Sequence, residues 1–580
     1  MSKIKKIMAG LLALVAAISL ASCNKSGLEV EFLNSIITSN SIKINMAFGN
    51  YSILENGGSV YVKKDGSTST SDYKTLEFNN DYSKSSCTYT GLNPETEYTF
   101  VVYLSLNDKD EEIGKQTYKT RSASSEDFNE ISTKDDLLNI DDSDTKLNYI
   151  LVDNIDLDGS EILLFDSSSS PYEGIFDGNG YEISNFKLKS SSGSGLFGYT
   201  SGATIKNLKI SNVSYYSTSL RSTLNMGALV GNAIDTKFED ITVDNVLYGK
   251  RNAENQLSAS TSSELKMGGV VGYANNSSFS NVNASNISIL MTKARKFVSM
   301  GLFAGYLDGN KYDKDDFAVK NSSASGEIYA NCEYSSSNGY TRIGGFIGTL
   351  GTTGKVVDSY SDVEIAYTRR NGTGYVNHSL YIGGFIGTSY NSQIKVENCV
   401  SVADIVAYAG QKSDLHESAD DLTSEEAKTN VYDNMIATKA YIGGFAGDLT
   451  NLISSVDKCV YAPRVDGIVV YGSKLSIVEN SSTSGSEGDS SDENTPSEYL
   501  YVGLFYGDCQ ATSKVKNSGY TKANKLAIKY SYTEEINDTK TTDVTDSLES
   551  FNLDEALLKV LNGSYVKKNT IDATAIIENN

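Results

Sequence analysis

The sequence is short of several residue types on which catalytic and metal sites depend. Its 580 residues include no Trp, 2 His and 4 Pro. Both histidines, His378 and His416, stand in polar stretches between apolar segments, where a solvated side chain is the ordinary outcome. No GxSxG, HExxH or Walker-type pattern is present, so hydrolase, metalloprotease and nucleotide-binding sites of these kinds have no support in the sequence.

Cysteine is also scarce. The chain has 6 Cys and no CxxC pair, which leaves zinc and thioredoxin-like sites without their usual ligands. Once Cys23 is assigned to the leader described below, the remaining cysteines are Cys87, Cys332, Cys399, Cys459 and Cys509. This odd number does not suit a disulfide framework. Cys399 and Cys459 occupy the same place in two repeats, so both a pair of small buried positions and a bridge stay open.

Basic residues are outnumbered, and the formal net charge is −23. Nucleic acid requires a basic face, so it is not an expected partner. The chain is instead rich in Tyr and Gly, with 38 and 49 residues respectively. Regularly placed Val, Ile and Tyr among polar residues predict strands rather than disorder.

The first residues form a leader. MSKIKKIMAGLLALVAAISLASC has a basic start and an apolar run that is too short to span a membrane as a helix. Its Leu-Ala-Ser-Cys ending resembles a bacterial lipoprotein signal, which implies cleavage of residues 1–22 and lipidation of Cys23. Residues 23–27 would then be a tether, and the chain would be lipid-anchored to the extracytoplasmic face of the cell envelope. An ordinary secretory signal is the alternative.

Residues 28–122 show alternating strands separated by polar turns, the pattern of a small antiparallel sandwich. GLNPETEYTFVVYL resembles fibronectin type III through Leu92, Pro94, Thr96, Tyr98 and Phe100. The resemblance implies that the Tyr98 hydroxyl bonds the backbone at a strand corner and that Leu92 and Phe100 enter the core. The Trp usual in that family is missing. Such domains are spacers or binding modules.

Residues 127–194 predict the N-terminal cap of a second module. Thr133 can cap a short helix with Asp136 three residues later. The ordered series IDL, FDGNGYEI, GLFG and IKNL resembles bacterial surface proteins with GLUG repeats. The resemblance implies a parallel β-helix, right-handed in that family.

A glycine motif such as YIGGFIGTSY recurs eight times within residues 195–540, which is typical of a solenoid. The copies end at Gly198, Gly231, Gly272, Gly305, Gly348, Gly387, Gly447 and Gly507. We expect these glycines to make tight corners with positive φ and to let neighbouring coils approach closely. Residues between them, such as Ile382, Phe385 and Ile386, are expected to fill the coil.

A second position recurs in the half of each repeat that follows the glycine motif. It is rich in Asn, which tolerates left-handed backbone and can hydrogen-bond to a copy of itself on the next coil. The aligned residues are Asn207, Asp240, Asn281, Asn321, Ser359, Asn398, Lys458 and Asn517. Stacking of these positions as a turn ladder is the main expectation that separates a β-helix from separate globules.

The repeats differ in length at one place, between the Val/Ile strand and the next glycine motif. Stacked coils would bring these insertions to one edge, where a binding function is expected. They are 216–225, 249–265, 290–298, 330–340, 368–379, 409–438 and 472–499. Residues 541–580 predict a C-terminal cap with a helix from Asn552 to Gly563 that covers the last coil.

No cofactor is expected, although two acidic clusters have oxygen ligands that suit Ca²⁺. One contains Asp153, Asp156 and Asp158; the other contains Asp308, Asn310 and Asp313, with Asp315 and Asp316 beside them. Neither has the spacing of a twelve-residue calcium loop, and solvated loops are the alternative reading.

The sequence therefore predicts an all-β chain: an Ig/fibronectin III-like sandwich, then a parallel β-helix with short terminal helices. The expected function is that of a lipid-anchored adhesin or binding protein without catalysis, with a glycan or protein ligand at the insertion edge. The alternatives are a carbohydrate-active β-helix enzyme, such as a polysaccharide lyase or a glycosidase, and a structural stalk.

Overall fold

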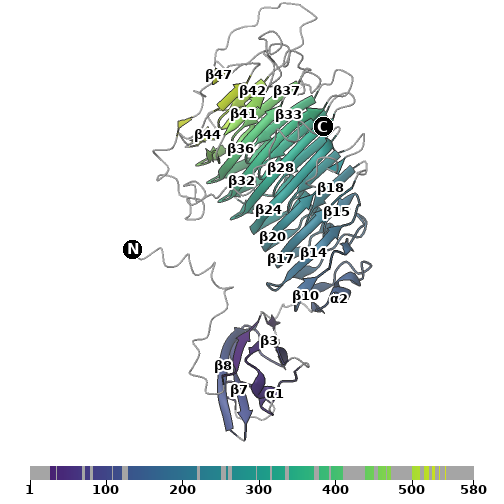
Figure 1. Ribbon diagram of the computed structural model, residues 1–580, viewed down its shortest axis with the longest axis vertical. Coiled ribbons are helices and arrows are strands. Elements are labelled where there is room, and N and C mark those ends of the chain that lie inside the picture. Colours follow the sequence, from purple (N-terminus) through teal and green to yellow (C-terminus); the bar gives the residue numbers. More distant parts are fainter. Residues whose placement is uncertain are drawn as a thin grey trace, which may run out of the picture. The chain divides into compact units, whose positions relative to one another are not determined.

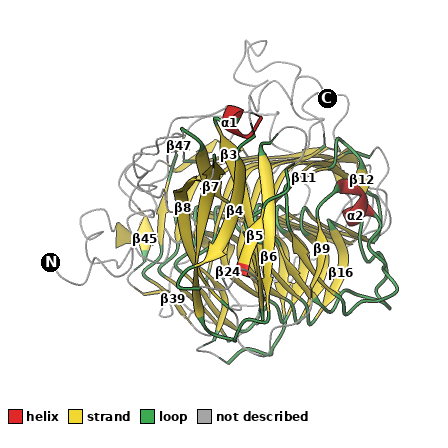
Figure 2. Ribbon diagram, turned by 90° about the horizontal axis from the view of Figure 1, so that it is seen from below, coloured by secondary structure: helices red, strands yellow, loops and turns green. Residues whose placement is uncertain are grey.

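The fold is known from a computed structural model. It describes residues 27–33, 35–38, 40–55, 57–67, 72–78, 82–107, 109–120, 128–217, 223–249, 257–258, 264–294, 297–313, 316–333, 339–370, 378–390, 393–408, 438–449, 455–464, 467–471, 500–509, 515–516, 518–520, 526–529, 534–535 and 542–543. Strands and loops account for nearly all of these residues, and helix occurs in them only at α1 (Ser52–Glu55) and α2 (Lys134–Leu138) (Figure 2).

The chain divides into two compact units. The first comprises Met1–Leu137, Leu147–Ile155 and Phe176–Glu182, and the second comprises Leu138–Lys146, Asp156–Ile175 and Ile183–Asn580. The predicted domain boundaries at 122, 127, 194 and 540 are finer than this division and stay predictions. The leader with Cys23, the residue Asn517, the residue His416 and the predicted C-terminal helix lie outside the described residues.

The first unit contains two antiparallel sheets, as the alternating pattern predicts. One sheet joins β1 (Glu29–Phe32), β3 (Ser41–Gly49), β2 (Ile36–Ile37) and β6 (Lys84–Thr90). The other has the order β5 (Tyr73–Thr75), β4 (Ser59–Lys64), β7 (Glu97–Leu106) and β8 (Lys109–Lys119). Ile42, Ile44, Met46, Val60, Val62 and Phe100 from the two sheets share one buried core.

The turn before β7 has the hydrogen bond expected for Tyr98 and the burial expected for Leu92 and Phe100. The backbone N–H of Asn93 donates a 2.9 Å hydrogen bond to the Tyr98 hydroxyl. Leu92 and Phe100 are both buried, and Phe100 contacts Tyr89 with ring centroids 4.5 Å apart. Tyr98 therefore satisfies a turn amide while its neighbours fill the core.

Short strands follow the sandwich. They are β9 (Phe128–Ile131), β10 (Asn148–Leu151), β11 (Ile155–Asp156), β12 (Glu161–Ile162), β13 (Ile175–Asp177) and β14 (Glu182–Leu188). Helix α2 has the predicted capping box: Asp136 N–H donates to Thr133 Oγ1 at 3.1 Å, and Thr133 N–H donates to Asp136 Oδ2 at 2.9 Å. Strands β9, β10 and β13 pair in parallel, which begins the coiled pattern.

The second unit is a parallel β-helix built from three sheets, which Figure 1 shows as stacked arrows (Figure 1). Sheet II contains β15 (Gly193–Ser194), β18 (Thr223–Gly227), β22 (Glu264–Gly268), β25 (Phe297–Gly301), β29 (Gly339–Gly344), β33 (His378–Gly383), β37 (Thr438–Gly443) and β42 (Leu500–Gly503). Sheet III contains β16 (Phe197–Ser201), β19 (Val230–Ile234), β23 (Val271–Asn275), β26 (Ala304–Asp308), β30 (Ile347–Leu350), β34 (Ile386–Ser389), β38 (Ala446–Asp448) and β43 (Tyr506–Asp508).

Sheet I holds the longest strands. From β17 onward its strands are β17 (Thr204–Tyr215), β20 (Lys237–Tyr248), β21 (Leu257–Ser258), β24 (Ser278–Ala294), β27 (Phe317–Lys320), β28 (Ser323–Glu333), β31 (Gly354–Val357), β32 (Tyr360–Arg370), β35 (Ile394–Glu397), β36 (Val400–Tyr408), β39 (Ser455–Asp457), β40 (Val460–Ala462), β41 (Ile468–Tyr471), β44 (Val515–Lys516), β45 (Gly519–Tyr520), β46 (Leu526–Lys529), β47 (Glu534–Glu535) and β48 (Thr542–Asp543). Among these, β46 and β47 pair antiparallel, whereas each repeat pairs in parallel with the next.

The interior of the coil is a stack of like side chains. Phe303, Phe346, Phe385, Phe445 and Phe505 come from consecutive coils and are all buried, with ring centroids 4.4 to 5.0 Å apart. Ile382, Phe385 and Ile386 are buried, as predicted. The spacing matches that of hydrogen-bonded strands, so each ring gains its neighbours from the coil before and the coil after.

The turn ladder exists, with one correction. Asn207, Asp240, Asn281, Asn321, Asn398 and Lys458 all have φ between 50° and 56°. In the fifth coil the left-handed residue is Asp358, so assigning Ser359 to the ladder was wrong by one residue. Ser359 is the next residue in the chain, and it is buried.

Amide side chains link this ladder between coils. Asn281 Nδ2 donates to Asp240 Oδ1 and Asn398 Nδ2 donates to Asp358 Oδ1, both at 2.6 Å. Since a short polar side chain tolerates positive φ and also reaches its copy one coil away, Asn and Asp recur at this position.

The motif-ending glycines crowd neighbouring coils, as predicted, but the positive φ expected at them was wrong. None of the eight has φ in the left-handed region. A Cβ added at Gly305 would lie 2.5 Å from Met267 N, and one at Gly348 would lie 2.6 Å from Met300 N. Glycine is required here because sheet III packs directly against the backbone of sheet II, one coil earlier.

Candidate functional site

The described strands that flank the predicted insertions end and begin along one edge of the β-helix. In sheet I, Tyr215 pairs with Tyr248 and Tyr248 with Ile289, so successive long strands approach this edge in register. The chain returns at the first residues of sheet II, where His378 pairs with Gly339 and with Thr438. Most residues of the insertions lie outside the described part of the chain. The prediction of an insertion at 290–298 was wrong, because β24 continues to Ala294 and β25 begins at Phe297. The strands that bracket them are described, and their register brings the insertion ends side by side.

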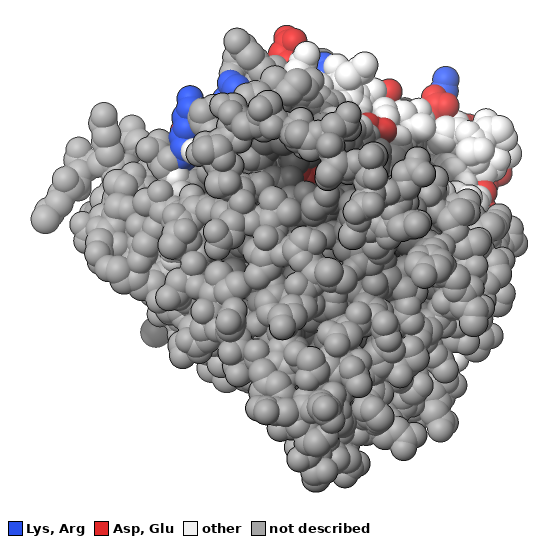
Figure 3. Space-filling model, turned by 90° about the horizontal axis from the view of Figure 1, so that it is seen from above, with Lys and Arg blue, Asp and Glu red and all other residues white. Residues whose placement is uncertain are grey.

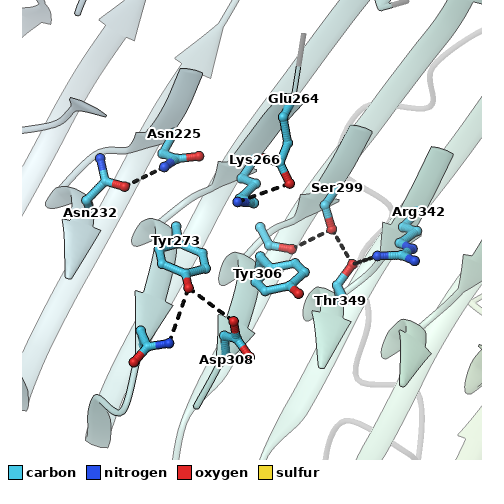
Figure 4. Close-up of polar contacts among 12 residues, drawn as sticks. Asn225, Asn232, Glu264, Lys266, Tyr273, Ser299, Tyr306, Asp308, Arg342 and Thr349 are labelled. Carbon is cyan, nitrogen blue, oxygen red and sulfur yellow. Dashed lines mark hydrogen bonds and ion pairs between the residues drawn. The ribbon is translucent and has the colours of Figure 1, made fainter. Parts of the chain in front are cut away.

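Sheets II and III meet in a seam of polar and aromatic side chains, shown in Figure 4. We define this seam by Asn225, Lys266, Ser299 and Arg342 of sheet II and by Asn232, Tyr273, Tyr306 and Thr349 of sheet III. Ser299 Oγ donates to the Gly305 carbonyl at 2.8 Å and lies 2.5 Å from Thr349 Oγ1. The glycines at the corner let the two faces approach closely enough for these contacts.

Cations and aromatic rings pack together in the seam. Lys266 Nζ lies 4.4 Å from the Tyr273 ring centroid and 5.0 Å from that of Tyr306, and these two rings are stacked 5.5 Å apart. Glu264 Oε1 pairs with Lys266 Nζ at 3.2 Å. The Arg342 guanidinium carbon lies 3.7 Å from the Tyr340 ring centroid. Such contacts hold the long basic side chains flat against the sheet.

The rim of the seam on sheet II borders the insertion edge. Phe297 and Tyr340 stand at the starts of β25 and β29, with ring centroids 5.0 Å apart. On the next two coils, Tyr381 and Tyr441 stack at 5.0 Å with 4° between their planes. All four rings are half-buried. Phe297 and Tyr340 are register partners at the strand starts, whereas Tyr381 and Tyr441 continue the row of Arg342, two residues further along the strands. We call these four rings the aromatic rim.

Asp308 organises the opposite rim, at the end of β26. Its carboxylate accepts hydrogen bonds from the hydroxyls of Tyr273 at 3.1 Å and Tyr390 at 2.8 Å. Tyr390 also hydrogen-bonds to Tyr306 and is 38% exposed. Burial raises the pKa of Tyr273 and of Tyr306 to about 12, so these phenols stay neutral hydrogen-bonding groups at physiological pH.

Two buried polar atoms of the seam have no hydrogen-bond partner in the structure. They are Arg342 Nε and Asn225 Oδ1. Buried donors and acceptors are ordinarily paired, and an unpaired one in a native protein is commonly met by a water or a ligand. The seam therefore has hydrogen-bonding capacity that its own side chains do not use.

Carboxylates gather at one place on the long strands of sheet I. Glu327, Glu364 and Asp404 are register partners on three consecutive coils, and Asp362 lies two residues before Glu364. Asp404 Oδ1 accepts the backbone N–H groups of Arg464 and Gly467 at 3.0 and 2.9 Å.

The side chain of Arg464 neutralises this cluster in part. Its Nε lies 3.1 Å from Asp362 Oδ1, although this oxygen receives no hydrogen bond. Burial raises the pKa of Asp362 to about 7, against the opposing effect of Arg464. A carboxyl that is protonated near neutrality, beside a second carboxylate, has the chemistry of an acid–base pair, but the same contacts also explain a structural ion pair that holds the turn before β41.

The described residues of the two predicted calcium sites do not assemble into ligand sets, and Asp315 lies outside the described residues. Asp308 is engaged by tyrosines, and Asp313 N–H donates to Asp316 Oδ2 at 3.1 Å. Asp156 Oδ1 accepts the backbone N–H of Asp158 at 2.8 Å. No group of three or more His, Cys, Asp or Glu side chains that could hold a metal occurs among the residues the structure describes.

The segment around the second calcium candidate is an insertion at another corner, between β26 and β27. Asn276 Oδ1 accepts the N–H groups of Asn310 and Lys311 at 3.0 and 3.1 Å, and Lys311 Nζ pairs with Asp235 at 2.8 Å. This segment therefore contacts turns on the two preceding coils. The expectation that every insertion falls at one place in the repeat was wrong for this one.

Sequence reasoning missed the seam and a second turn ladder. Asn185, Asn212, Asn245 and Asn286 have φ between 53° and 58°. Asn212 Nδ2 donates to Asn185 Oδ1 at 2.9 Å, and Asn245 Nδ2 donates to Asn212 Oδ1 at 2.7 Å. The recurring Ser/Asp-Asn-Val/Ile in KISNV, VDNV and ASNI was the signal that could have found this ladder.

Within the described part of the chain, no helix has the length and apolar character needed to cross a membrane. Figure 3 shows both carboxylates and basic groups among the described atoms of that view.

Comparisons with known proteins leave the activity open. No family model matches the chain, and no curated protein matches it. Among solved structures, an IgA1 protease is similar over 89% of this chain and 32% of its own, at 12% identity and a TM-score of 0.34. A family 28 exopolygalacturonase of Yersinia enterocolitica is similar over 77% of this chain and 92% of its own, at 10% identity and a TM-score of 0.18. The chain spans about a third of the IgA1 protease, and similarities this low decide nothing about function.

Proposed function

We propose that the chain is a lipid-anchored binding protein of the bacterial cell surface, in which the β-helix presents a ligand-binding edge and performs no catalysis. The single observation that carries this proposal is the register of sheets I and II, which brings the strand ends that flank the insertions to one edge. Variable loops on a rigid repeat scaffold are a common way to build a recognition surface.

The aromatic rim beside this edge is the proposed ligand contact. Phe297, Tyr340, Tyr381 and Tyr441 offer half-buried rings, and Arg342 adds a cation with an unpaired Nε atom. Rings with polar edges, together with a fixed guanidinium, suit contacts with sugar rings or with an extended peptide. A glycan or a protein ligand therefore fits this surface, and the leader predicts that it meets the ligand outside the cytoplasm.

Removal of the two longest insertions tests the edge. Since β36 ends at Tyr408 and β37 begins at Thr438, residues 411–435 can be replaced by a Gly-Ser link without touching either strand. Residues 474–497, between Tyr471 and Leu500, can be replaced in the same way. We expect cells that display this variant to lose at least about tenfold in adherence to glycan arrays and host cells, since loops of this kind carry the contacts.

A point substitution tests the rim with the fold intact. Tyr340→Ala should weaken adherence, whereas Tyr73→Ala, at a 38% exposed tyrosine in the first unit, should leave it unchanged. If both variants and the loop replacement adhere like the parent chain, the β-helix acts as a stalk and the binding proposal is wrong.

A carbohydrate-active enzyme is the second candidate, and one observation favours it. Asp362, with a pKa of about 7, lies on the same sheet as Asp404 on the next coil. Hydrolysis of glycosidic bonds requires one protonated carboxyl and one carboxylate. Activity on a panel of neutral and acidic polysaccharides that is lost in both Asp362→Asn and Asp404→Asn, and kept in Asp244→Asn, would establish it in place of the first proposal.

A further inference from the structure

Two cysteines occupy the same position on neighbouring coils. Glu397 pairs with Asp457 and Val400 pairs with Val460, so the residues Cys399 and Cys459 lie between two matched register pairs. Neighbouring strands are separated by ~4.8 Å, which is inside the range of about 4.4–6.8 Å that disulfides span between Cα atoms. The two thiols are free and fully buried, and Cys459 Sγ lies 3.6 Å from the Val396 carbonyl, on the coil that carries Cys399.

We propose that Cys399 and Cys459 form a disulfide that staples two neighbouring coils when the chain folds outside the cytoplasm. The two thiols lose two protons and two electrons, and one S–S bond forms. The electrons reduce the disulfide of a dithiol–disulfide oxidant to its dithiol. The bridge closes a chain segment that contains the 409–438 insertion, so it links the two coils that flank this insertion.

The column in which the two cysteines stand shows what cysteine adds. Ser322, Ser359 and Ser518 take the same place in other coils, and each hydroxyl donates to the carbonyl two residues earlier, at 2.9, 2.7 and 2.8 Å. Cys399 Sγ and Cys459 Sγ make the same contact with Glu397 and Asp457, at 3.3 and 3.4 Å. Serine already satisfies this turn, so cysteine on two consecutive coils supplies a covalent link that serine cannot.

The bridge must form before the following coil covers it. Burial raises the pKa of Cys399 well above its ordinary value, and the thiolate is the form that reacts with an oxidant. Both thiols are 0% exposed in the folded chain. Oxidation therefore belongs to folding, when the eighth coil with Ser518 has not yet packed against Cys459. Among the described cysteines, Cys87 and Cys509 share no register position with another cysteine.

Peptide mapping of the full chain tests the proposal. Cells that make the protein with its own leader are lysed in an alkylating agent, and the chain is recovered from the envelope and digested with trypsin. We expect the peptides 396–412 and 459–464 to be joined, with a mass two hydrogens below their sum. The same chain made without residues 1–22 and kept in the cytoplasm should give both peptides alkylated and separate.

Two results overturn the proposal. One is recovery of Cys399 and Cys459 as alkylated, separate peptides from the envelope chain, and the other is recovery of the full chain from the cytoplasm alone.

A second measurement separates a bridge from simple packing. Reductant should lower the urea concentration of half-unfolding for the wild-type chain and leave it unchanged for Cys399→Ser, which keeps the hydrogen bond of the serine column.

Discussion

Substitution of Gly348 distinguishes two explanations of the glycine motif. A Cβ at this position would lie 2.6 Å from both the N and the O of Met300 and 2.7 Å from the Gly305 carbonyl. Ordinary contacts of such an atom are about 3.4 Å or longer, so backbone on the preceding coil would have to move by most of an ångström. Because the obstacle is main chain held in two sheets, Gly348→Ala should destabilise the β-helix by at least about 3 kcal/mol.

Gly202 provides the matched control. It has φ of 69° and nothing within 4 Å of an added Cβ, so Gly202→Ala carries only the strain of a left-handed residue, about 1 kcal/mol. Asp235 and Asn276 stand at the same turn of the next two coils with φ of 49° and 51°, so Gly202→Asn should be nearly neutral. Urea unfolding followed by circular dichroism measures all three variants.

If close contact between coils is the reason for glycine in the motif, the three variants should differ in stability. Gly348→Ala should be the least stable, Gly202→Ala intermediate and Gly202→Asn close to wild type. A Gly348→Ala chain that unfolds at the wild-type urea concentration, while Gly202→Ala is strongly destabilised, would show that backbone conformation and not coil-to-coil contact requires the motif.

Three further predictions follow from single side chains. The pKa of Asp362 rises from 3.8 to about 7 on folding. The free energy of unfolding linked to its neutral form is therefore complete below pH 3.8 and is lost as pH rises through 7, by about 4 kcal/mol at most. Asp362→Asn should remove this slope from the pH dependence of urea unfolding, and an unchanged slope would contradict the assignment. Asn281→Ala should cost about 2 kcal/mol through its φ of 56° and the lost bond to Asp240, whereas Asn281→Gly should cost less in the same unfolding assay; equal losses would show that φ is not the cause. Phe385→Ala should cost about 3–5 kcal/mol by opening the ring stack, with Phe385→Leu as the milder control, and near-wild-type unfolding of the alanine variant would argue against stacking.

The repeat pattern predicted the fold because it records burial and turn conformation directly. Alternating apolar residues specified the strands, and Asn207, Asp240 and Asn281 marked a left-handed turn that only a few residue types tolerate. The alignment failed by one residue at Asp358 because Ser359 is also polar and short. Sequence spacing alone does not distinguish a left-handed turn residue from the buried hydroxyl that follows it.

The seam could not be predicted because it depends on how sheet III folds back over sheet II. Lys266 contacts Tyr306, which belongs to the next coil, and Tyr390 reaches Asp308 across Gly351. No periodicity in the chain encodes these cross-coil contacts. The carboxylates Asp362 and Asp404 were similarly hidden among 73 acidic residues until the register of β32 and β36 placed them on one face.

Distances between spin labels on sheet II test the stacking of coils most directly. Thr223, Glu264, Phe297, Tyr340, Ser379 and Lys439 are register partners along this sheet. Labels on cysteines introduced at Thr223 and Ser379 are four coils apart and should be about 19 Å apart, whereas Thr223 and Lys439 should be about 24 Å apart, at ~4.8 Å per coil. One equal step per coil, independent of the length of the insertion between, is the predicted result; separations that grow with the number of intervening residues would contradict a single β-helix.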